Sequence, residues 1–325
     1  MIFEHGGDLD KVVKFYGGRK EEWIDLSTGI NPHSYPYKDI RISDLRNLPE
    51  QTNMENLNKV AKIYFQTNAT ISPISGAQTA INILPFLLPN KSISILEPTY
   101  SEYRKVFSVF SREIKSVKRL NQLKNSQIAI LCNPNNPDGT LYSSKDLIEL
   151  SESVETLIVD ESFIDLYPDV SLSKKINNKT DNIIIIRSFG KFFGLAGLRL
   201  GFIISGTKIN LKINSLIGPW PVSTIASDIA IKALSDDIWI KKTMDELKKG
   251  SKILDGLAHN LNWEILGGTN LYRLYKTPNA KKTQSILANH KIWSRRFNYS
   301  QKWIRLGLPK KTEFIKIKKV FKDLY

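Results

Sequence analysis

The sequence predicts an α/β fold with a mostly parallel sheet in a large domain, accompanied by a smaller α+β domain. Through the middle of the chain, short and nearly continuous runs of apolar residues alternate with helical patterns. Strands that helices cover on both faces have this composition. After about residue 230 the order changes to one long amphipathic helix, several short strands and a closing helix. That order is typical of α+β structure.

The strands of the large domain are predicted from their β-branched residues, and helical stretches separate them. Between two of these strands, residues 143–154 have helical periodicity, with Ser143 or Ser144 able to cap the helix and Asp146 in its first turn. Strands alternating with helices favour a parallel sheet. The predicted strands are residues 92–98, 126–134, 155–161, 182–189 and 200–205.

The smaller domain is predicted from both ends of the chain. The first 40 or so residues contain loop chemistry, such as STGINPHSYPY at 27–37, and we expect them to cross from one domain to the other. We therefore expect a large domain at 41–230 and a small domain made of 1–40 plus 231–325. The C-terminal elements are a helix at 236–261, strands at 262–268, 269–275, 292–297 and 303–309, and a helix at 312–324.

Composition excludes several classes of protein. The single cysteine, Cys132, excludes an intramolecular disulfide and a cysteine-based zinc cluster, and the four histidines lack metal-ligand spacing. We expect no bound metal. The acidic N-terminal residues do not fit a signal peptide, and the most apolar run, 81–89, is short and contains Pro85. We expect a soluble, cytoplasmic protein.

The net charge of +15 is the strongest anomaly of composition. It could reflect binding to nucleic acid or an anionic membrane, attraction of a phosphorylated substrate, or simply a surface rich in lysine. The lysines are scattered, acidic residues stand between many of them, and aromatic residues do not alternate with basic ones. We favour the lysine-rich surface and expect neither a nucleic-acid nor a membrane partner.

Two motifs stand where a helix or a turn begins. Gly76, Ala77 and Gln78 stand where a helix begins, and the free N–H groups of a helix N-terminus can receive a phosphate. The run CNPNNPDGT, 132–140, predicts a tight turn stabilised by asparagine side chains. Each motif is a weak signal by itself.

Two further motifs place charged residues at the ends of apolar strands. Residues 155–161 end on Asp160 and Glu161, and strand neighbours point to opposite faces, so only one can face a common pocket. A buried carboxylate needs a partner, and a structural ion pair is the alternative explanation. The run RSFGKFFGLAGLRLGF, 187–202, sets Ser188, Lys191 and Arg199 among Gly and apolar residues.

Taken in order, these motifs resemble the fold-type I pyridoxal-phosphate enzymes, the aspartate aminotransferase superfamily, over essentially the whole chain. The resemblance implies an aspartate-aminotransferase-like fold type I, with a seven-stranded type of sheet, and the cofactor pyridoxal 5'-phosphate. It implies that Lys191 forms a Schiff base with the cofactor and that Asp160 keeps its ring nitrogen protonated. The other residues implied to hold the cofactor are Asn136 at the ring hydroxyl, Tyr100 stacked on the ring, and Ser188, Arg199 and the Gly76–Ala77–Gln78 turn at the phosphate.

The N-terminal HGGDLD and STGINP segments, with GPWPVS, GGTNLYRL and WIRLGLP, are similar to the threonine-phosphate decarboxylases of cobalamin biosynthesis. The resemblance implies decarboxylation of L-threonine O-3-phosphate to (R)-1-aminopropan-2-ol O-2-phosphate by a homodimer. The alternative is an aminotransferase of the histidinol-phosphate type. A non-enzymatic binding or regulatory protein of the same fold is a further alternative, although such a protein would be expected to lack Lys191 or Asp160. A more remote alternative is a basic, non-enzymatic nucleic-acid-binding protein, which would retain DNA in a salt-sensitive manner.

The same resemblance implies residues that bind the substrate. Arg305 would bind the carboxylate as a bidentate pair. His5, Asn31 and Arg296 are the candidates for the rest of the substrate, with Arg296 or its neighbour Arg295 at the phosphate. If this segment is a strand, one of the two arginines points away from the site, and His5 could instead be a packing residue.

Three positions depart from the pattern of many relatives. Gly190 precedes Lys191 where many aminotransferases have Ser or Thr, so one phosphate contact is missing. Phe163 stands where many have a tyrosine that bonds the ring hydroxyl. Leu48 stands where histidinol-phosphate aminotransferases have a tyrosine that reaches the partner subunit, which weakens the aminotransferase alternative and puts that contact in doubt.

Overall fold

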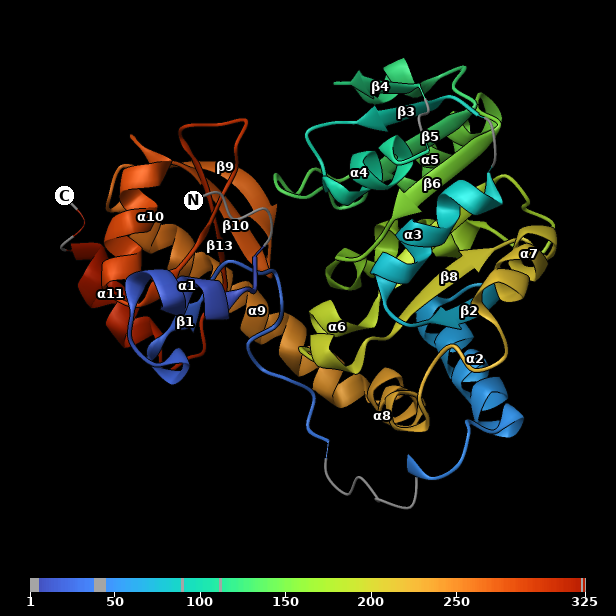
Figure 1. Cartoon of the computed structure of the whole chain (residues 1–325), viewed down its shortest axis with the longest axis horizontal. Coiled ribbons are helices and arrows are strands. Elements are labelled where there is room, and N and C mark those ends of the chain that lie inside the picture. Colours follow the sequence, from blue (N-terminus) through green and yellow to red (C-terminus); the bar gives the residue numbers. More distant parts are fainter. Residues whose placement is uncertain (1–5, 38–44, 89–90, 111–112, 323, 325) are drawn as a thin grey trace. The chain divides into compact units, whose positions relative to one another are not determined.

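The computed structural model describes residues 6–37, 45–88, 91–110, 113–322 and 324. The chain divides into two compact units (Figure 1). The large unit comprises residues 35–136 and 140–239, and the small unit comprises residues 1–34, 137–139 and 240–325.

The large unit is built on a seven-stranded sheet of order β2-β8-β7-β6-β5-β3-β4 (Figure 1). Strand β8 is antiparallel to both of its neighbours, and all other neighbouring pairs are parallel. The mostly parallel sheet predicted from the sequence is therefore confirmed. Its strands are β2 (Thr70–Ile74), β3 (Ile93–Leu96), β4 (Ile114–Val117), β5 (Ile128–Cys132), β6 (Thr156–Asp160), β7 (Ile183–Ser188) and β8 (Gly201–Ser205).

All five predicted strands are present, and the two that the sequence did not predict, β2 and β4, are the edges of the sheet. Every residue of β5 and β6 is buried, which explains their continuous apolar runs. Strand β2 contains Pro73, which argues against a central strand because proline has no N–H to donate. An edge strand tolerates it.

Helices and the sheet enclose a core cluster that contains Ile81, Leu84, Tyr103, Ile130 and Ile158. The predicted helix after residue 143 is α5, and the Ser143 side chain caps it by accepting from the N–H of Asp146. None of the described helices is long and apolar enough to cross a membrane. The helices of the large unit are α2 (Gln51–Phe65), α3 (Ala77–Leu87), α4 (Glu102–Ser108), α5 (Ser144–Glu152), α6 (Phe189–Phe192), α7 (Thr207–Ile217) and α8 (Thr224–Leu234).

The small unit contains a four-stranded antiparallel sheet of order β12-β13-β10-β9 and a separate parallel pair of β1 and β11. Its strands are β1 (Ile24–Asp25), β9 (Glu264–Thr269), β10 (Tyr272–Lys276), β11 (Ile292–Trp293), β12 (Arg295–Arg296) and β13 (Trp303–Gly307). Its helices are α1 (Leu9–Tyr16), α10 (Ala280–Asn289), α11 (Phe314–Lys322) and the part of α9 (Asp237–His259) that begins at Ile240.

One expectation for the small unit was wrong. The segment 292–297, predicted as one strand, is divided at Ser294 into β11 and β12, which pair in different sheets. The N-terminal segment also contains a helix that the sequence did not predict, α1, which Asp8 caps by accepting from the N–H of Lys11. That helix buries Val12 in a cluster with Trp23 and Trp293.

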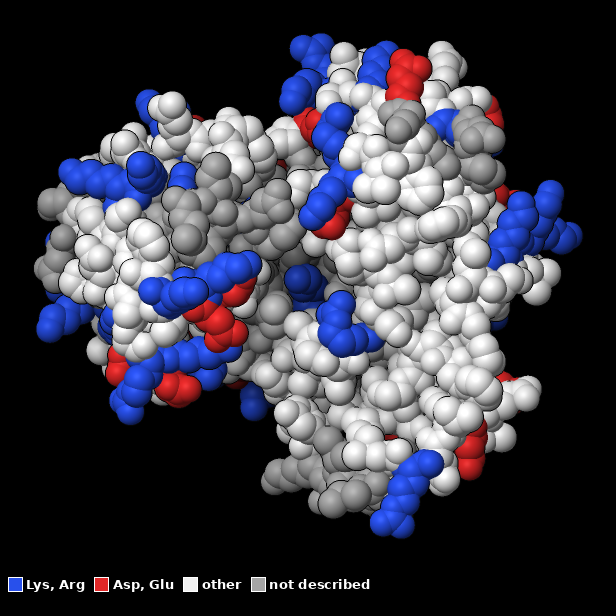
Figure 2. All heavy atoms as spheres, viewed as in Figure 1, with Lys and Arg blue, Asp and Glu red and all other residues white. Residues whose placement is uncertain are grey.

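Basic side chains are distributed over the surface. On the face drawn in Figure 2, Lys and Arg are spread over many places, with Asp and Glu beside several of them, and do not form one continuous patch. Many form exposed pairs, such as Lys20 with Asp10 and Lys311 with Glu246. Exposed pairs of this kind contribute little to stability.

Candidate active site

The segments predicted to bind the cofactor meet at one edge of the large unit's sheet. At this edge β6 ends on Asp160 and β7 ends on Ser188, while β5 and β3 end just before Asn136 and Tyr100. Parallel strands end at the same edge, so these residues follow one another across the sheet.

Two more segments reach the same edge because of the direction of β8. Strand β2 runs parallel to β7, since both are antiparallel to β8, and β2 is followed by Gly76. Strand β8 runs the other way and begins here, directly after Arg199 and Leu200. The residues predicted to bind the cofactor phosphate therefore lie at the ends of β2, β8 and β7. The residues predicted to contact the cofactor ring lie at the ends of β6, β5 and β3. This order along the edge suits an elongated ligand.

At the end of the site predicted to bind the phosphate, Gly76 leaves no room for a side chain. Gly76 has a φ of 86°, and a Cβ on it would lie 2.6 Å from Nη2 of Arg199. Helix α3 begins at the next residue, Ala77. The first N–H groups of a helix lack partners within the helix, so amides and a guanidinium come together at this turn. This donor set suits a phosphate dianion.

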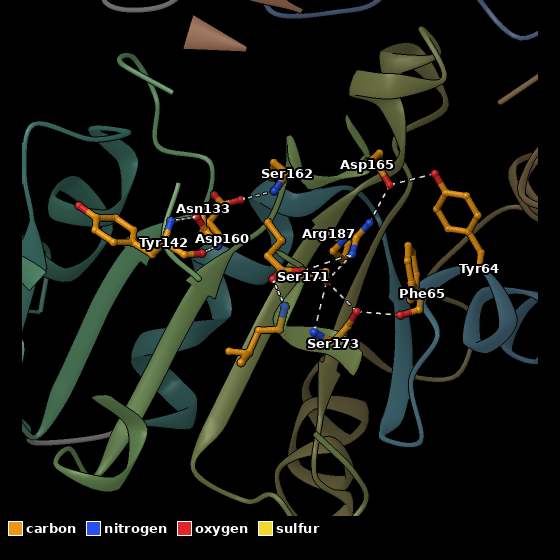
Figure 3. Close-up of polar contacts among 12 residues, drawn as sticks. Tyr64, Phe65, Asn133, Tyr142, Asp160, Ser162, Asp165, Ser171, Ser173 and Arg187 are labelled. Atoms are coloured by element: carbon orange, nitrogen blue, oxygen red, sulfur yellow. Dashed lines mark hydrogen bonds and ion pairs between the residues drawn. The ribbon is translucent and has the colours of Figure 1, made fainter. Parts of the chain in front are cut away.

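The two acidic residues at the end of β6 have different partners. Asp160 is 5% exposed, and its Oδ1 accepts from the N–H of Ser162 at 2.9 Å (Figure 3). Its Oδ2 accepts from the Tyr103 hydroxyl at 2.8 Å. The next residue, Glu161, is fully buried and accepts from Arg187. This agrees with the strand rule that neighbours face opposite ways, and it leaves Asp160 as the candidate for the cofactor.

Arg187 stands at the centre of a buried ion-pair network that the sequence analysis did not identify. Its Nη2 lies 2.7 Å from Oδ1 of Asp165, and its Nη1 lies 3.3 Å from Oε2 of Glu161 (Figure 3). The hydroxyls of Tyr64 and Ser171 also donate to these carboxylates. The available signal was an arginine inside an apolar strand, beside a second acidic residue at the end of the neighbouring strand.

The structure distinguishes the three asparagines of the turn after β5. The Asn133 side chain donates to the carbonyl of Tyr142 and accepts from its N–H, which closes the loop (Figure 3). The Asn135 side chain donates to the carbonyl of Pro98 and accepts from the Thr99 hydroxyl. Both amides hold backbone or neighbouring loops in place, and Asn136 stays the residue that the family resemblance implies for the ring hydroxyl.

Lys191 lies in α6, directly after β7, and its Nζ is 5.8 Å from the centre of the Phe163 ring. A Cβ on the preceding Gly190 would lie 2.5 Å from the Cα of Ala196. The backbone of the following turn therefore fills the place where a Ser or Thr side chain would stand. Tyr100, the predicted stacking residue, donates its hydroxyl to Oε1 of Gln78 at 3.2 Å.

In the small unit, Arg305 is held on β13 by neighbouring polar and aromatic groups. Its Nη2 donates to the carbonyl of Ser27 at 2.7 Å, and its guanidinium carbon lies 4.9 Å from the centre of the Tyr272 ring. The Ser27 hydroxyl donates to Asp25 and accepts from the N–H of Gly7. Burial raises the pKa of Asp25, against the hydrogen bonds from Ser27 and the charge of Arg305.

The strand register separates the two adjacent arginines of β12. Arg295 is directly opposite Arg305 in the antiparallel pair, and side chains of directly opposite residues share a face. Arg296 is opposite Ile304 and donates from Nε to Oε1 of Gln284 on α10 at 2.9 Å. The geometry thus groups Arg295, rather than Arg296, with Arg305.

The other two predicted substrate residues lie near the N-terminus. Asn31 is buried, and its Oδ1 accepts from the N–H of His33 at 2.9 Å. His5 lies outside the described residues.

The sequence pattern of the family "aminotransferase class I and II" matches residues 23–314 of this chain. The chain belongs to the aminotransferase class I and II family. It is 35% identical to a threonine-phosphate decarboxylase from a Sinorhizobium species, over 94% of this chain and 92% of that protein. It is 26% identical to a histidinol-phosphate aminotransferase from Buchnera aphidicola, over 95% and 82%. The solved histidinol-phosphate aminotransferase from Clostridium acetobutylicum has the same fold, with a TM-score of 0.80 at 22% identity over 93% and 98% of the two chains.

The protein is therefore a pyridoxal-phosphate enzyme, as the sequence predicted. The donor set at the sheet edge fits this cofactor, because the Arg199 guanidinium meets the start of α3 at Gly76 at one end and a buried carboxylate, Asp160, stands farther along the edge. Lys191 lies in the segment that joins β7 to β8, between these two parts of the edge.

The departures from other aminotransferases have structural consequences. Because Ala196 packs against Gly190, a serine there needs a different turn, not only a different side chain. Phe163 is 7% exposed and supplies an apolar surface near Lys191 where a tyrosine would supply a hydroxyl. Leu48 is 62% exposed.

Proposed function

We propose that this enzyme catalyses the decarboxylation of L-threonine O-3-phosphate to (R)-1-aminopropan-2-ol O-2-phosphate, a reaction of cobalamin biosynthesis. The observation that carries the proposal is the similarity along nearly the full length to a threonine-phosphate decarboxylase, at 35% identity against 26% for the histidinol-phosphate aminotransferase. The absence of a tyrosine at Leu48 supports the same choice.

The residues of the sheet edge would hold the cofactor. Arg199, Ser188 and the first amides of α3, those of Ala77 and Gln78 after Gly76, bind its phosphate. Asn136 donates to the ring hydroxyl, and Tyr100 stacks on the ring. When bound, pyridoxal phosphate supplies an aldehyde carbon for amines and a protonated ring that withdraws electrons from the bonds at Cα of the substrate.

Two residues of the large unit take part in the chemistry. Asp160 holds the proton on the ring nitrogen, because a carboxylate stabilises the charged form of its partner. Lys191 would hold the cofactor covalently through its amine, and the same amine would supply the proton that replaces the lost carboxylate at Cα of the substrate. The apolar surface at Phe163 limits water near this amine.

Residues of the small unit would bind and orient the substrate. Arg305 binds the substrate carboxylate in a bidentate pair. Because Arg295 shares its face, we assign the substrate phosphate to Arg295 in place of Arg296. Asn31 and His5 remain candidates for other contacts. Holding the two anionic ends of the substrate would fix its orientation about Cα, so that the carboxylate rather than the Cα proton is the group lost.

The test is to incubate the purified holoenzyme with threonine phosphate and to measure carbon dioxide and keto acid in the same samples. Carbon dioxide in equal amount to the phosphorylated amino alcohol, without keto acid, is the expected result. A parallel incubation with histidinol phosphate and 2-oxoglutarate measures transamination. Transamination of histidinol phosphate without decarboxylation of threonine phosphate would refute the proposal in favour of the aminotransferase alternative.

We also propose that the enzyme is a homodimer. Its interface would lie near the edge of the large unit's sheet that is predicted to bind the cofactor, which we call the cofactor edge. Trp220 is 55% exposed, although burial of an aromatic ring is favourable. The Ser75 hydroxyl donates to the carbonyl of Pro221, which places this loop beside the turn of Gly76. Light scattering should give twice the chain mass, and Trp220→Ser should shift the equilibrium toward monomer. A wild-type monomer at micromolar concentration would contradict this.

A further inference from the structure

Tyr103 combines complete burial with a polar contact to the cofactor edge. It lies in α4, is 0% exposed and belongs to the core cluster that contains Ile130 and Ile158. Phenylalanine would fill this apolar position without a polar atom to satisfy. The hydroxyl is accommodated because it donates to Oδ2 of Asp160 at 2.8 Å. The tyrosine thus connects the apolar core to Asp160.

The direction of this hydrogen bond is fixed. Burial, together with the neighbouring charge of Asp160, raises the pKa of Tyr103 well above its usual value, so the hydroxyl keeps its proton and always donates. The other oxygen of Asp160 accepts from the N–H of Ser162 at 2.9 Å. The carboxylate is therefore held from two directions and cannot rotate without losing one bond.

The position of Tyr103 along the chain also places it beside the predicted ring site. It follows Tyr100 by three residues, its N–H donates to the Tyr100 carbonyl, and the two ring centres are 6.4 Å apart. One turn of backbone thus carries both the residue predicted to stack on the cofactor ring and the residue that contacts Asp160.

We propose that Tyr103 is a positioning residue, whose hydroxyl fixes the orientation in which the Asp160 carboxylate pairs with the protonated ring nitrogen of pyridoxal phosphate. The inference rests on the cofactor and on the role proposed for Asp160. It is independent of whether the enzyme is a decarboxylase or an aminotransferase.

The small unit offers a matched control for a purely structural role. Tyr275 is also 0% exposed, and its hydroxyl also donates to an aspartate, Oδ1 of Asp255, at 2.8 Å. Neither residue of this pair belongs to the predicted cofactor site. Tyr103→Phe and Tyr275→Phe therefore both remove a buried tyrosine hydroxyl that donates to an aspartate.

The experiment compares wild type, Tyr103→Phe and Tyr275→Phe in three measurements that need no substrate. These are the melting temperature of the apoprotein, the apparent dissociation constant for pyridoxal phosphate on reconstitution, and the visible absorption spectrum of the reconstituted protein against pH. We expect both variants to melt at lower temperature. Only Tyr103→Phe should bind the cofactor about tenfold or more weakly, the loss of one hydrogen bond to a charged group, and show a changed spectrum.

Two results would overturn the proposal. Tyr103→Phe could bind the cofactor with wild-type affinity and an unchanged spectrum, or both variants could weaken binding equally, which would make the role structural only. Absence of cofactor binding by wild-type protein would instead refute the cofactor assignment, and absence of decarboxylation would refute the proposed function alone.

A second substitution covers the case in which Tyr103→Phe does not fold. Fluorotyrosines incorporated at position 103 keep the ring and the hydroxyl but make the hydroxyl a stronger donor. A spectrum that shifts progressively from tyrosine to 3-fluorotyrosine to 3,5-difluorotyrosine supports the proposal. An identical spectrum in all three proteins overturns it.

Discussion

Replacement of Arg187 by leucine tests how the strand ends beneath the cofactor edge are held together. The arginine is 4% exposed, and its guanidinium contacts Asp165 at 2.7 Å and Glu161 at 3.3 Å and lies 4.3 Å from the centre of the Phe65 ring. Leucine preserves apolar volume but leaves two buried carboxylates without their cation. Breaking a buried pair in this way costs about 3–5 kcal/mol. At about 2–4 °C per kcal/mol for a domain of this size, the melting temperature should fall by roughly 6–20 °C.

The stability lost in Arg187→Leu should depend on pH, in a direction that the structure fixes. Burial raises the pKa of Glu161, and the charge of Arg187 acts in the opposite sense. A carboxyl group with a raised folded-state pKa binds protons more tightly in the folded than in the unfolded protein, so stability falls as pH rises through that pKa. Removal of Arg187 raises the pKa of Glu161 further. The loss of stability in Arg187→Leu relative to wild type should therefore be larger at about pH 8 than at about pH 5.5.

The assay is thermal unfolding of the apoproteins, followed by circular dichroism at both pH values. Arg273→Leu is the control, because Arg273 pairs with Asp255 at 2.9 Å in a contact that is 17% and 23% exposed. Arg273→Leu should lose about 1 kcal/mol of stability, as expected for a partly exposed ion pair. An Arg187→Leu protein that melts within about 2 °C of wild type, or shows the same deficit at both pH values, would refute the reasoning.

Three further predictions concern single positions. Gly190→Ser should lose about 1–3 kcal/mol of stability and bind pyridoxal phosphate more weakly, because its Cβ meets the Ala196 backbone at 2.5 Å; unchanged cofactor titration and melting would contradict this. Arg295→Gln should raise KM for threonine phosphate about tenfold or more, and Arg296→Gln should raise it less; equal effects in steady-state kinetics would contradict the assignment from the strand register. Ser143→Ala should cost about 1 kcal/mol in denaturant unfolding through loss of the α5 cap, without a change in cofactor affinity; a weakened affinity would show that the effect is not local.

Much of the large unit could be predicted because its constraints are local in sequence. A strand buried on both faces must be apolar throughout, so β5, β6 and β7 were visible as runs of Ile, Val and Leu. The cap of α5 was visible because the Ser143 side chain and the Asp146 N–H are three residues apart. The edge strand β2 was missed because its proline is a signal against a strand, and only its place in the sheet makes that proline acceptable.

The sequence by itself determined the family, and with it the cofactor, because ordered motifs at successive strand ends need no knowledge of which strands pair. It did not determine which of several adjacent residues of the same kind faces a ligand. Tertiary structure decided that Glu161 turns to Arg187 while Asp160 contacts Tyr103, and that Arg295 rather than Arg296 is opposite Arg305. These choices depend on register and packing between segments far apart in the chain. A side chain's partner there is set by the neighbouring strand or helix, and no local pattern records it.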